Sequence, residues 1–289
     1  MKVDPPRLVT MSCLGKNGFF GNQLFQYAFL KIYAKRYGLY SQNPKWIGEY
    51  LFGHRELPVT VKLAPVTDRE MKEEDLLDPS FPVYQGKDLK GYFHFFSTRH
   101  YQPHKDYFRS LFQPAEHIRG TLDRGMERLR SRGNTIVAIH IRRGDFVKYL
   151  KEDWCFIAPS DWYIEWLNGF WRQLDRPVLY IASDEPRKVL NDFRAFNPVT
   201  AKDVFDELPI PDIYRKIQPS LHGYVAATDF YPDYHVLRHC DYLAISNSTF
   251  SFSASMLNER AVSFHRPHYK SRQLIPFDPW DCYPLQLKG

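Results

Sequence analysis

The second half of the chain alternates between short apolar segments and segments with helical spacing, and this alternation constrains the fold more than any other feature. Residues 135–141 form an apolar, largely β-branched run that is typical of a buried strand. Further strands are predicted at 178–182 and 242–246, and helical patterns follow them at 185–192 and 251–260. Strands that alternate with helices at this spacing predict a parallel sheet in an α/β fold.

In the first half of the chain, a predicted strand followed by a predicted helix is found only at the beginning. A strand is predicted at 9–13 and a helix at 23–37, with a glycine-containing loop between them. Five prolines interrupt residues 38–88, so irregular structure with one charged surface helix is expected there.

The length of 289 residues fits two modest domains. We predict an N-terminal domain at 1–125 and a C-terminal domain at 126–289. Because 44% of the residues are hydrophobic and 25% are charged, each domain can bury a core of ordinary composition.

Two arginines follow the strand predicted at 135–141, in the sequence His-Ile-Arg-Arg-Gly-Asp. Ligands bind beyond the carboxyl ends of parallel strands, and arginine makes bidentate contacts with phosphate. Either Arg142 or Arg143 could face a pyrophosphate while the other pairs with Asp145, and His140 reaches the same point. The alternative is a salt-bridged turn without a ligand.

A glycine loop precedes the first predicted helix and ends in Gly21, Asn22 and Gln23. Glycine lets the backbone approach a phosphate closely, and the helix N-terminus supplies N–H groups. The spacing matches neither the dinucleotide fingerprint nor the P-loop, so an ordinary turn with a helix cap is the alternative.

Hydroxyl groups accumulate after the strand predicted at 242–246. The hydroxyl-bearing residues are Ser246, Ser248, Thr249 and Ser251. Serine and threonine commonly cap helices, but four hydroxyls exceed what one cap requires. Ser183 and Asp184 follow another strand, where the carboxylate could accept hydrogen bonds from a guanine, although Ser-Asp is also a common cap.

The net charge and the cysteine content indicate which classes of ligand and metal the protein is expected to bind. The 39 Lys and Arg residues exceed the 33 Asp and Glu residues by a net charge of +6, which favours an anionic partner such as a nucleotide, a nucleic acid or an acidic lipid. The chain lacks a basic stripe and the RNP and helix-turn-helix signatures, so a nucleic-acid partner is not expected. The four cysteines are too scattered for a zinc site.

No segment has the length and apolarity of a signal peptide or a membrane span, so we expect a cytoplasmic protein. Its basic surface is compatible with loose attachment to an anionic membrane.

Five motifs together resemble, in order, the motif series of the bacterial α-1,2-fucosyltransferases. They are GNQLFQYAF at 21–29, GYFHFFSTRHY at 91–101, HIRRGD at 140–145, IASDEP at 181–186 and ISNSTFSFSASML at 245–257. The resemblance implies a GT-B-like α/β fold with two Rossmann-like halves and the active site in the cleft between them. The half at 1–125 would lie on the acceptor side, and the half at 126–289 would bind GDP-fucose. This chain departs from the family at Phe19-Phe20 and at Phe252-Ser253, which leaves the donor unchanged and the acceptor open.

The resemblance also implies residue roles. Arg142 should bind the GDP phosphates with Arg143 in support, while His140 and Asp184 contact the guanosine. The implied donor-binding residues are Gly21, Asn22, Gln23, His140, Arg142, Ser183, Asp184, Asn247, Ser248, Thr249 and Ser251. Arg142, Arg143, Asp145 and His140 are the implied catalytic residues, and Asp145, then His140, then a carboxylate of the first half are the candidates for the base.

The implied reaction transfers L-fucose from GDP-β-L-fucose, with inversion, to the 2-hydroxyl of a galactose-containing oligosaccharide or glycolipid. No cofactor is implied. Because no two aspartates are separated by one residue, as in the Asp-x-Asp motif of metal-dependent glycosyltransferases, arginine and helix termini are expected to replace a metal. The alternatives are α-1,6 transfer to a chitin-like acceptor, an inert nucleotide-binding homologue, and a nucleic-acid-binding module.

Overall fold

The computed structural model describes residues 6–77, 82–208 and 228–289. The described chain forms two compact units, one ending at Glu116 and the other containing His117–Leu208 and Thr228–Gly289. Helix α5 extends from Glu116 to Ser131, so the boundary predicted at 125/126 falls inside this helix.

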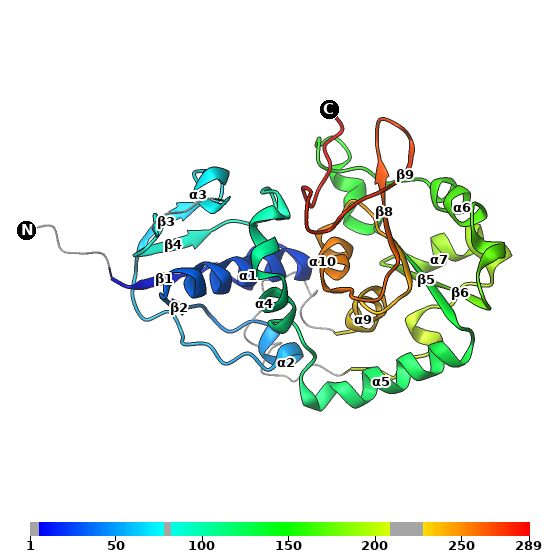
Figure 1. The fold of residues 1–289 in the computed structure, drawn as a ribbon, viewed down its shortest axis with the longest axis horizontal. Helices are drawn as coiled ribbons and strands as arrows, with labels where there is room; N and C mark the ends of the chain where they lie inside the picture. The colour runs from blue at the N-terminus through cyan, green and yellow to red at the C-terminus, as the bar shows by residue number, and fades with distance from the viewer. Residues whose placement is uncertain (1–5, 78–81, 209–227) are drawn as a thin grey trace, which may run out of the picture. The chain divides into compact units, whose positions relative to one another are not determined.

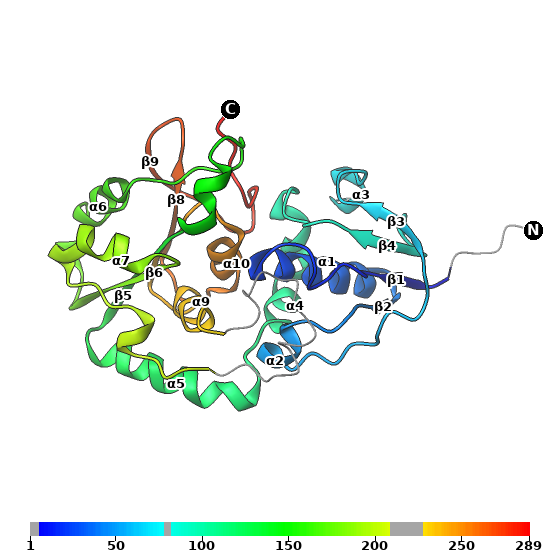
Figure 2. The same cartoon turned by 180° about the vertical axis from the view of Figure 1, so that it is seen from behind.

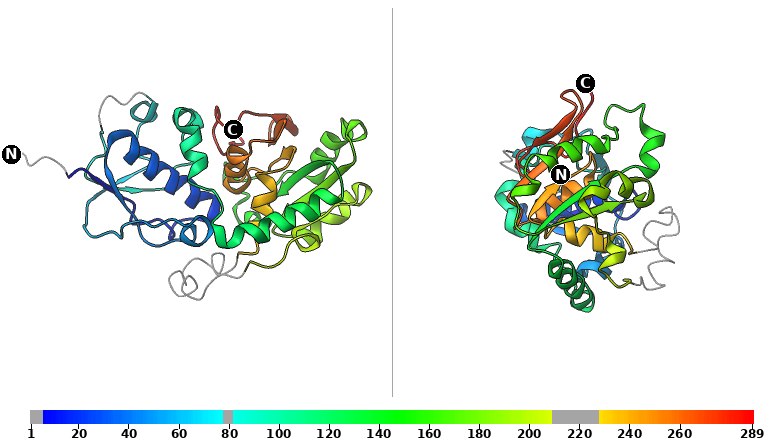
Figure 3. Two further views of the ribbon diagram at one scale, coloured as in Figure 1. Left: turned by 60° about the horizontal axis from the view of Figure 1, so that its bottom comes forward. Right: turned by 90° about the vertical axis from the view of Figure 1, so that its right-hand side faces the viewer.

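A four-stranded parallel sheet organises the first unit, with strand order β2-β1-β4-β3. Its elements are β1 (Leu8–Thr10), α1 (Phe20–Tyr37), β2 (Tyr40–Gln42), α2 (Gly48–Phe52), β3 (Ala64–Thr67), α3 (Glu73–Leu77), β4 (Lys87–Lys90), the 3-10 helix η1 (Thr98–His104) and α4 (Lys105–Ser110). The long helix α1 runs beside the sheet (Figures 1 and 3). Gly38, with φ 61°, ends α1 in the left-handed conformation that favours glycine.

Aromatic side chains from several segments surround α1 and form the core of the first unit. The Phe29 and Phe93 rings stack with centroids 4.4 Å apart, and the Tyr27 and Trp46 rings lie 5.1 Å apart. Since all four side chains are buried, core packing accounts for much of the 16% aromatic content.

The expectation of irregular structure at 38–88 was partly wrong. Three of the four strands of the first sheet lie wholly or partly in this range, because short strands can be held by their neighbours without an apolar pattern of their own. In β4 the buried Asp88 carboxylate accepts hydrogen bonds from the Thr10 hydroxyl, at 2.8 Å, and from Ser12. The predicted surface helix is present as α3.

A five-stranded sheet with order β6-β5-β7-β8-β9 organises the second unit (Figures 1 and 2). Its strands are β5 (Thr135–Ile141), β6 (Pro177–Ser183), β7 (Tyr242–Ala244), β8 (Ser263–His268) and β9 (Gln273–Pro276). Its α-helices are α5 (Glu116–Ser131), α6 (Ser160–Asn168), α7 (Pro186–Val189), α9 (Tyr231–Leu237) and α10 (Thr249–Leu257). Its 3-10 helices are η2 (Gly144–Tyr149), η3 (Trp171–Gln173), η4 (Leu190–Phe196) and η5 (Ala201–Asp203). All adjacent strands are parallel except the β8–β9 pair.

Alternate residues of β5 face opposite sides of the sheet. Val137 and Ile139 pack in a cluster with Tyr163 of α6, whereas the His140 ring lies 5.1 Å from Phe250 of α10 on the other side. This coverage of both faces explains the apolar run from which β5 was correctly predicted. Within the described residues, none of the helices combines the length and apolarity needed to cross a bilayer.

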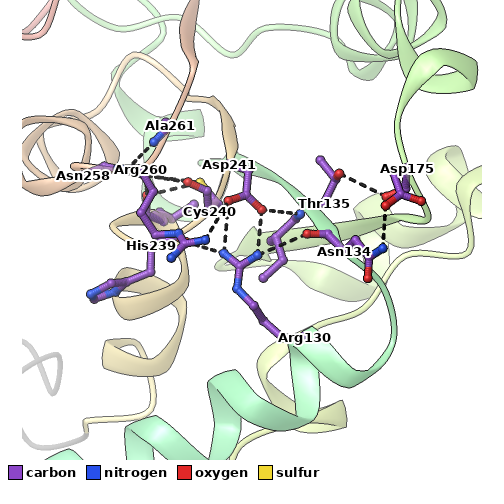
Figure 4. Close-up of polar contacts among 12 residues, drawn as sticks. Arg130, Asn134, Thr135, Asp175, His239, Cys240, Asp241, Asn258, Arg260 and Ala261 are labelled. Carbon is purple, nitrogen blue, oxygen red and sulfur yellow. Dashed lines mark hydrogen bonds and ion pairs between the residues drawn. The ribbon is translucent and has the colours of Figure 1, made fainter.

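The amino-terminal edge of the second sheet is fastened by an ion-pair network around Asp241 (Figure 4). The Asp241 carboxylate accepts both terminal nitrogens of Arg130, at 2.9 and 3.2 Å, and the backbone N–H of Ile136, at 2.8 Å. Burial acts to raise the pKa of Asp241, but the bonds from Arg130 and Ile136 together lower it. The network therefore joins the end of α5 to the starts of β5 and β7.

Buried histidines predict that acid destabilises the protein. Burial lowers the pKa to about 4 at His54, His100 and His239, and to about 3 at His94 and His140. An unfolded chain binds protons at these positions near pH 6.5, so their contribution is complete above that pH and declines below it. We expect the unfolding free energy to fall between pH 7 and pH 5, with each histidine adding a slope that rises below pH 6.5 toward at most about 1.4 kcal/mol per pH unit. Urea unfolding at both pH values measures this, and equal midpoints would contradict it.

Candidate active site

The loops after β5 and β7 leave adjacent strands at the carboxyl edge of the second sheet. The chain passes from β5 to β6 on one side and later returns to β7 on the other, so β5 and β7 border the topological switch point. Ligands of open α/β sheets bind at such points. His140 Nδ1 and Ser246 Oγ lie 2.8 Å apart and connect the two strands there.

The Arg142 side chain is held between two carboxylates. Its Nη1 donates to Asp184 Oδ2 at 2.6 Å, its Nη2 donates to Asp145 Oδ1, and its guanidinium lies 5.5 Å from the Phe146 ring centroid. Only 9% of the side chain is exposed. The arginine is therefore oriented by its neighbours before any ligand binds.

Asp184 connects the ends of β5 and β6. Besides Arg142 it accepts the backbone N–H of Arg143, through Oδ1 at 2.9 Å. Its other oxygen fills the space beside Gly144, where a Cβ atom would lie 2.3 Å from Oδ2. Glycine is therefore needed at 144 for close approach rather than for an unusual backbone conformation.

Arg143 is oriented differently from Arg142. Its Nε lies 3.9 Å from Glu185 Oε2, and a third of the side chain is exposed. Arg142 is the arginine that pairs with Asp145, as the alternative of a salt-bridged turn also expects, and the contact of either arginine with a pyrophosphate stays a prediction.

His140 is neutral at ordinary pH. Burial, followed by the nearby charge of Arg142, lowers its pKa to about 3. A general base works best when its pKa is near the working pH, so this environment favours His140 as a hydrogen-bonding residue rather than a base.

The hydroxyl-rich segment forms the start of α10. Ser248 is the N-cap, and its Oγ accepts the backbone N–H of Phe250, as the simpler explanation of these hydroxyls expects. The helix begins at Thr249 rather than at the predicted residue 251, which places Ser251 in its first turn. Ser251 is fully buried, and its Oγ has no hydrogen-bond partner among the described residues.

The side chains of two predicted donor-binding residues form hydrogen bonds with other residues of the protein. Asn247 Nδ2 donates to the backbone oxygens of Trp154 and Gln286, and its Oδ1 accepts the N–H of Gln286. Ser183 Oγ accepts the N–H of Glu185. Both side chains hold loops around the switch point.

Gly21, Asn22 and Gln23 belong to the first unit, and the sequence placed the start of their helix three residues late. Gly21 and Asn22 were expected ahead of the helix predicted at 23–37, but with Gln23 they lie in the first turn of α1, which begins at Phe20. Gln23 Nε2 donates to Gly18 O at 3.2 Å and fixes the glycine loop. Gly18 has φ 69°, and a Cβ there would lie 2.3 Å from Asn22 Nδ2.

Sequence reasoning missed Gly144 and Phe250 as residues that shape the site. Gly144 gives Asp184 room, and Phe250 packs against His140. The glycine between Arg143 and Asp145 was a usable signal, because a glycine beside charged residues often marks a close approach.

A family comparison decides the classification. The model of the family described as Glycosyl transferase family 11 matches residues 3–190, well over half of the chain. The chain belongs to glycosyl transferase family 11. The matched range includes the β5 arginines and Asp184, and the family agrees with the resemblance to α-1,2-fucosyltransferases.

Two curated relatives of this family 11 chain are mammalian. Galactoside alpha-(1,2)-fucosyltransferase 1 of Bos taurus is 25% identical over 181 residues, which is 59% of this chain and 50% of that protein. The protein of the same name from Alouatta caraya is 26% identical over 179 residues, 58% of this chain and 49% of that protein. The chain spans about half the length of these relatives.

Solved structures share the fold of this family 11 chain. NodZ alpha-1,6-fucosyltransferase soaked with GDP-fucose has a TM-score of 0.56 at 13% identity, with coverage of 94% of this chain and 99% of that chain. An Arabidopsis thaliana FUT1 variant in complex with GDP has a TM-score of 0.54 at 12% identity, with coverage of 94% and 72%. These similarities confirm the predicted GT-B-like α/β fold.

Proposed function

We propose that this family 11 chain is an inverting fucosyltransferase that moves L-fucose from GDP-β-L-fucose to the 2-hydroxyl of a galactoside. The observation that carries the proposal is the oriented Arg142 at the switch point of the second sheet, between Asp145 and Asp184. The similar structures support the donor, since they were solved with GDP-fucose or GDP. The names of the curated relatives support the linkage.

In this proposal, Arg142 and the N-terminus of α10 bind the diphosphate. A guanidinium suits phosphate oxygens, and the first turn of a helix offers N–H groups and a favourable dipole. The buried Ser251 hydroxyl supplies an unused polar group in that turn. Asp184 already engages Arg142 and the Arg143 backbone, so we assign it the positioning of Arg142 in place of the guanosine contact.

The proposed reaction forms a bond between the acceptor 2-oxygen and C1 of fucose as the bond from C1 to the phosphate oxygen breaks. GDP leaves, and Arg142 with the α10 N-terminus stabilises its added charge without a metal. Asp145 is the first candidate to receive the acceptor proton, because 26% of its side chain is exposed beside Arg142 whereas His140 is a weak base.

The test measures GDP release from GDP-fucose in EDTA, with and without lactose. We expect lactose to stimulate release by the wild type, and Arg142→Ala to lower kcat/KM by about 100-fold or more because the charge on the leaving group loses its partner. Arg172→Ala, an exposed arginine in η3, is the matched control and should retain full activity. A folded wild-type protein that releases no GDP under any of these conditions would overturn the proposal.

Analysis of the reaction product distinguishes the proposed function from two alternatives, which are α-1,6 transfer and nucleotide binding without turnover. Replacing lactose with chitotriose and analysing the linkage distinguishes α-1,2 from α-1,6 transfer. A homologue that binds GDP by calorimetry but turns over neither acceptor would be an inert nucleotide-binding protein.

A further inference from the structure

An aromatic loop follows β4 in the first unit and has no role in the donor site proposed above. It comprises residues 91–96, Gly-Tyr-Phe-His-Phe-Phe. In the order β2-β1-β4-β3, strands β1 and β4 border the switch point of this sheet, because the chain moves from β1 to β2 on one side and returns on the other. The aromatic loop therefore occupies the position where an open α/β sheet binds its ligand.

The loop is held rigidly. The Asp68 carboxylate, through Oδ2, accepts the backbone N–H groups of Tyr92 at 2.7 Å and Phe93 at 3.0 Å. Gly91, with φ 145°, lies so close to Asp68 that a Cβ would stand 2.2 Å from its Cγ. Phe93 adopts φ 56°, a conformation that costs a non-glycine residue energy.

The fixed backbone sends the rings in two directions. Phe93 is fully buried against Phe29, and Phe96 is buried as well. Tyr92 and Phe95 instead remain 38% and 46% exposed, with ring centroids 6.4 Å apart. A strained backbone and a buried carboxylate thus hold the loop in a conformation that exposes two aromatic side chains to solvent.

A polar group lies between the two exposed rings. The His94 ring centroid is 4.3 Å from that of Phe95 and 5.4 Å from that of Tyr92. His94 is 5% exposed, and its Nδ1 has no hydrogen-bond partner among the described residues. Burial lowers its pKa to about 3, so the ring is neutral. The buried His94 ring packs against both exposed rings.

The glycine loop lies against this surface. A Cβ at Gly18 would approach the Tyr92 ring to 2.9 Å, so the loop after β1 and the loop after β4 are in contact. The glycine loop therefore packs against the Tyr92 ring. Rigid support of this kind is what precise ligand positioning requires.

We propose that Tyr92 and Phe95 form a stacking platform for a sugar ring of the acceptor, with the buried His94 ring packed against both. A pyranose has an apolar face of C–H groups that packs on an aromatic ring, while its hydroxyls reach polar neighbours. The identification of this sugar as the acceptor rests on the proposed function.

Acceptor kinetics test the platform. For Tyr92→Ala and Phe95→Ala we expect the KM for the acceptor to rise about tenfold, with the KM for GDP-fucose and the slow release of GDP without acceptor unchanged. Tyr92→Phe keeps the ring and should retain the wild-type KM, whereas Phe95→Leu keeps apolarity without a ring and should not. Tyr40→Ala is the matched control, because this 72% exposed tyrosine begins β2 at the opposite edge of the same sheet.

Direct binding separates this inference from the proposed function. Saturation-transfer NMR with lactose and chitotriose, without donor, should show sugar binding to the wild type and its loss in Phe95→Ala at an unchanged melting temperature. Binding that is lost in this way supports the platform even if no turnover is found, which would contradict the proposed function alone. Absence of binding of either sugar to the wild type, an unchanged acceptor KM in the alanine variants, or a raised KM for GDP-fucose instead would overturn the platform.

Discussion

Replacing Gly144 with alanine is expected to lower kcat/KM for GDP-fucose by roughly 100-fold while the protein stays folded. The new Cβ would lie 2.3 Å from Asp184 Oδ2, which is the oxygen that accepts Arg142 Nη1. Asp184 must move, and Arg142 then loses one of the two carboxylates that orient it. A displacement of about 1 Å at such a group is enough to cost two orders of magnitude in rate.

Gly120 provides the matched control for this substitution. It lies in α5 of the same unit, and a Cβ there would meet its nearest neighbour, Arg124 Nη1, at an ordinary 3.6 Å. Gly120→Ala should therefore retain full activity and gain a little stability, because alanine favours helix over glycine. Steady-state kinetics and thermal melts of both variants test these expected changes in activity and stability. Wild-type kcat/KM in Gly144→Ala would show that the position of Asp184 is unimportant for the reaction.

Asp241→Ala is expected to destabilise the second unit by about 2–4 kcal/mol. The substitution leaves the Arg130 guanidinium without its carboxylate and the Ile136 N–H without its acceptor, and both groups are largely withdrawn from water. For a unit of this size the melting temperature should fall by roughly 5–10 °C.

Asp175→Ala is the matched control for Asp241→Ala, because both aspartates lie at the amino-terminal edge of the second sheet. Asp175 also joins a loop there, through Asn134 Nδ2 at 2.5 Å, but it is exposed and should contribute little (Figure 4). Urea unfolding followed by circular dichroism compares the two variants. If both lowered the midpoint equally, burial of the Arg130–Asp241 pair would not be the source of the effect.

The sequence predicted the second unit well because buried parallel strands leave a clear pattern. Strand β5 was predicted with its observed bounds, and the expected pairing of one of the two following arginines with Asp145 is present at Arg142. The start of α10 was placed two residues late, since Thr249 and Phe250 continue a cap sequence rather than an apolar helical pattern.

The first unit was less predictable because its strands are short and partly charged. Strand β4 reads Lys-Asp-Leu-Lys, and the reason that Asp88 can be buried there is its contact with Thr10 and Ser12, which are distant in sequence. The same applies to the space beside Gly144: the glycine is visible in the sequence, but Asp184, which fills the space, comes from another strand. Contacts between distant residues determine these features, and local patterns do not record them.

The separation of the Asp241 network from the carboxyl edge of the second sheet has a consequence for evolution. The ion pairs around Asp241 lie at the strand starts, whereas Arg142 with its two carboxylates and the α10 N-terminus lie at the strand ends. Substitutions in the carboxyl-edge loops that keep the contacts of Arg142 and Asn247 can therefore accumulate while the Asp241 network is intact, which is a property that lets a scaffold acquire new specificities. Directed evolution that diversifies those loops, with the amino-terminal network kept, should yield a large share of folded variants.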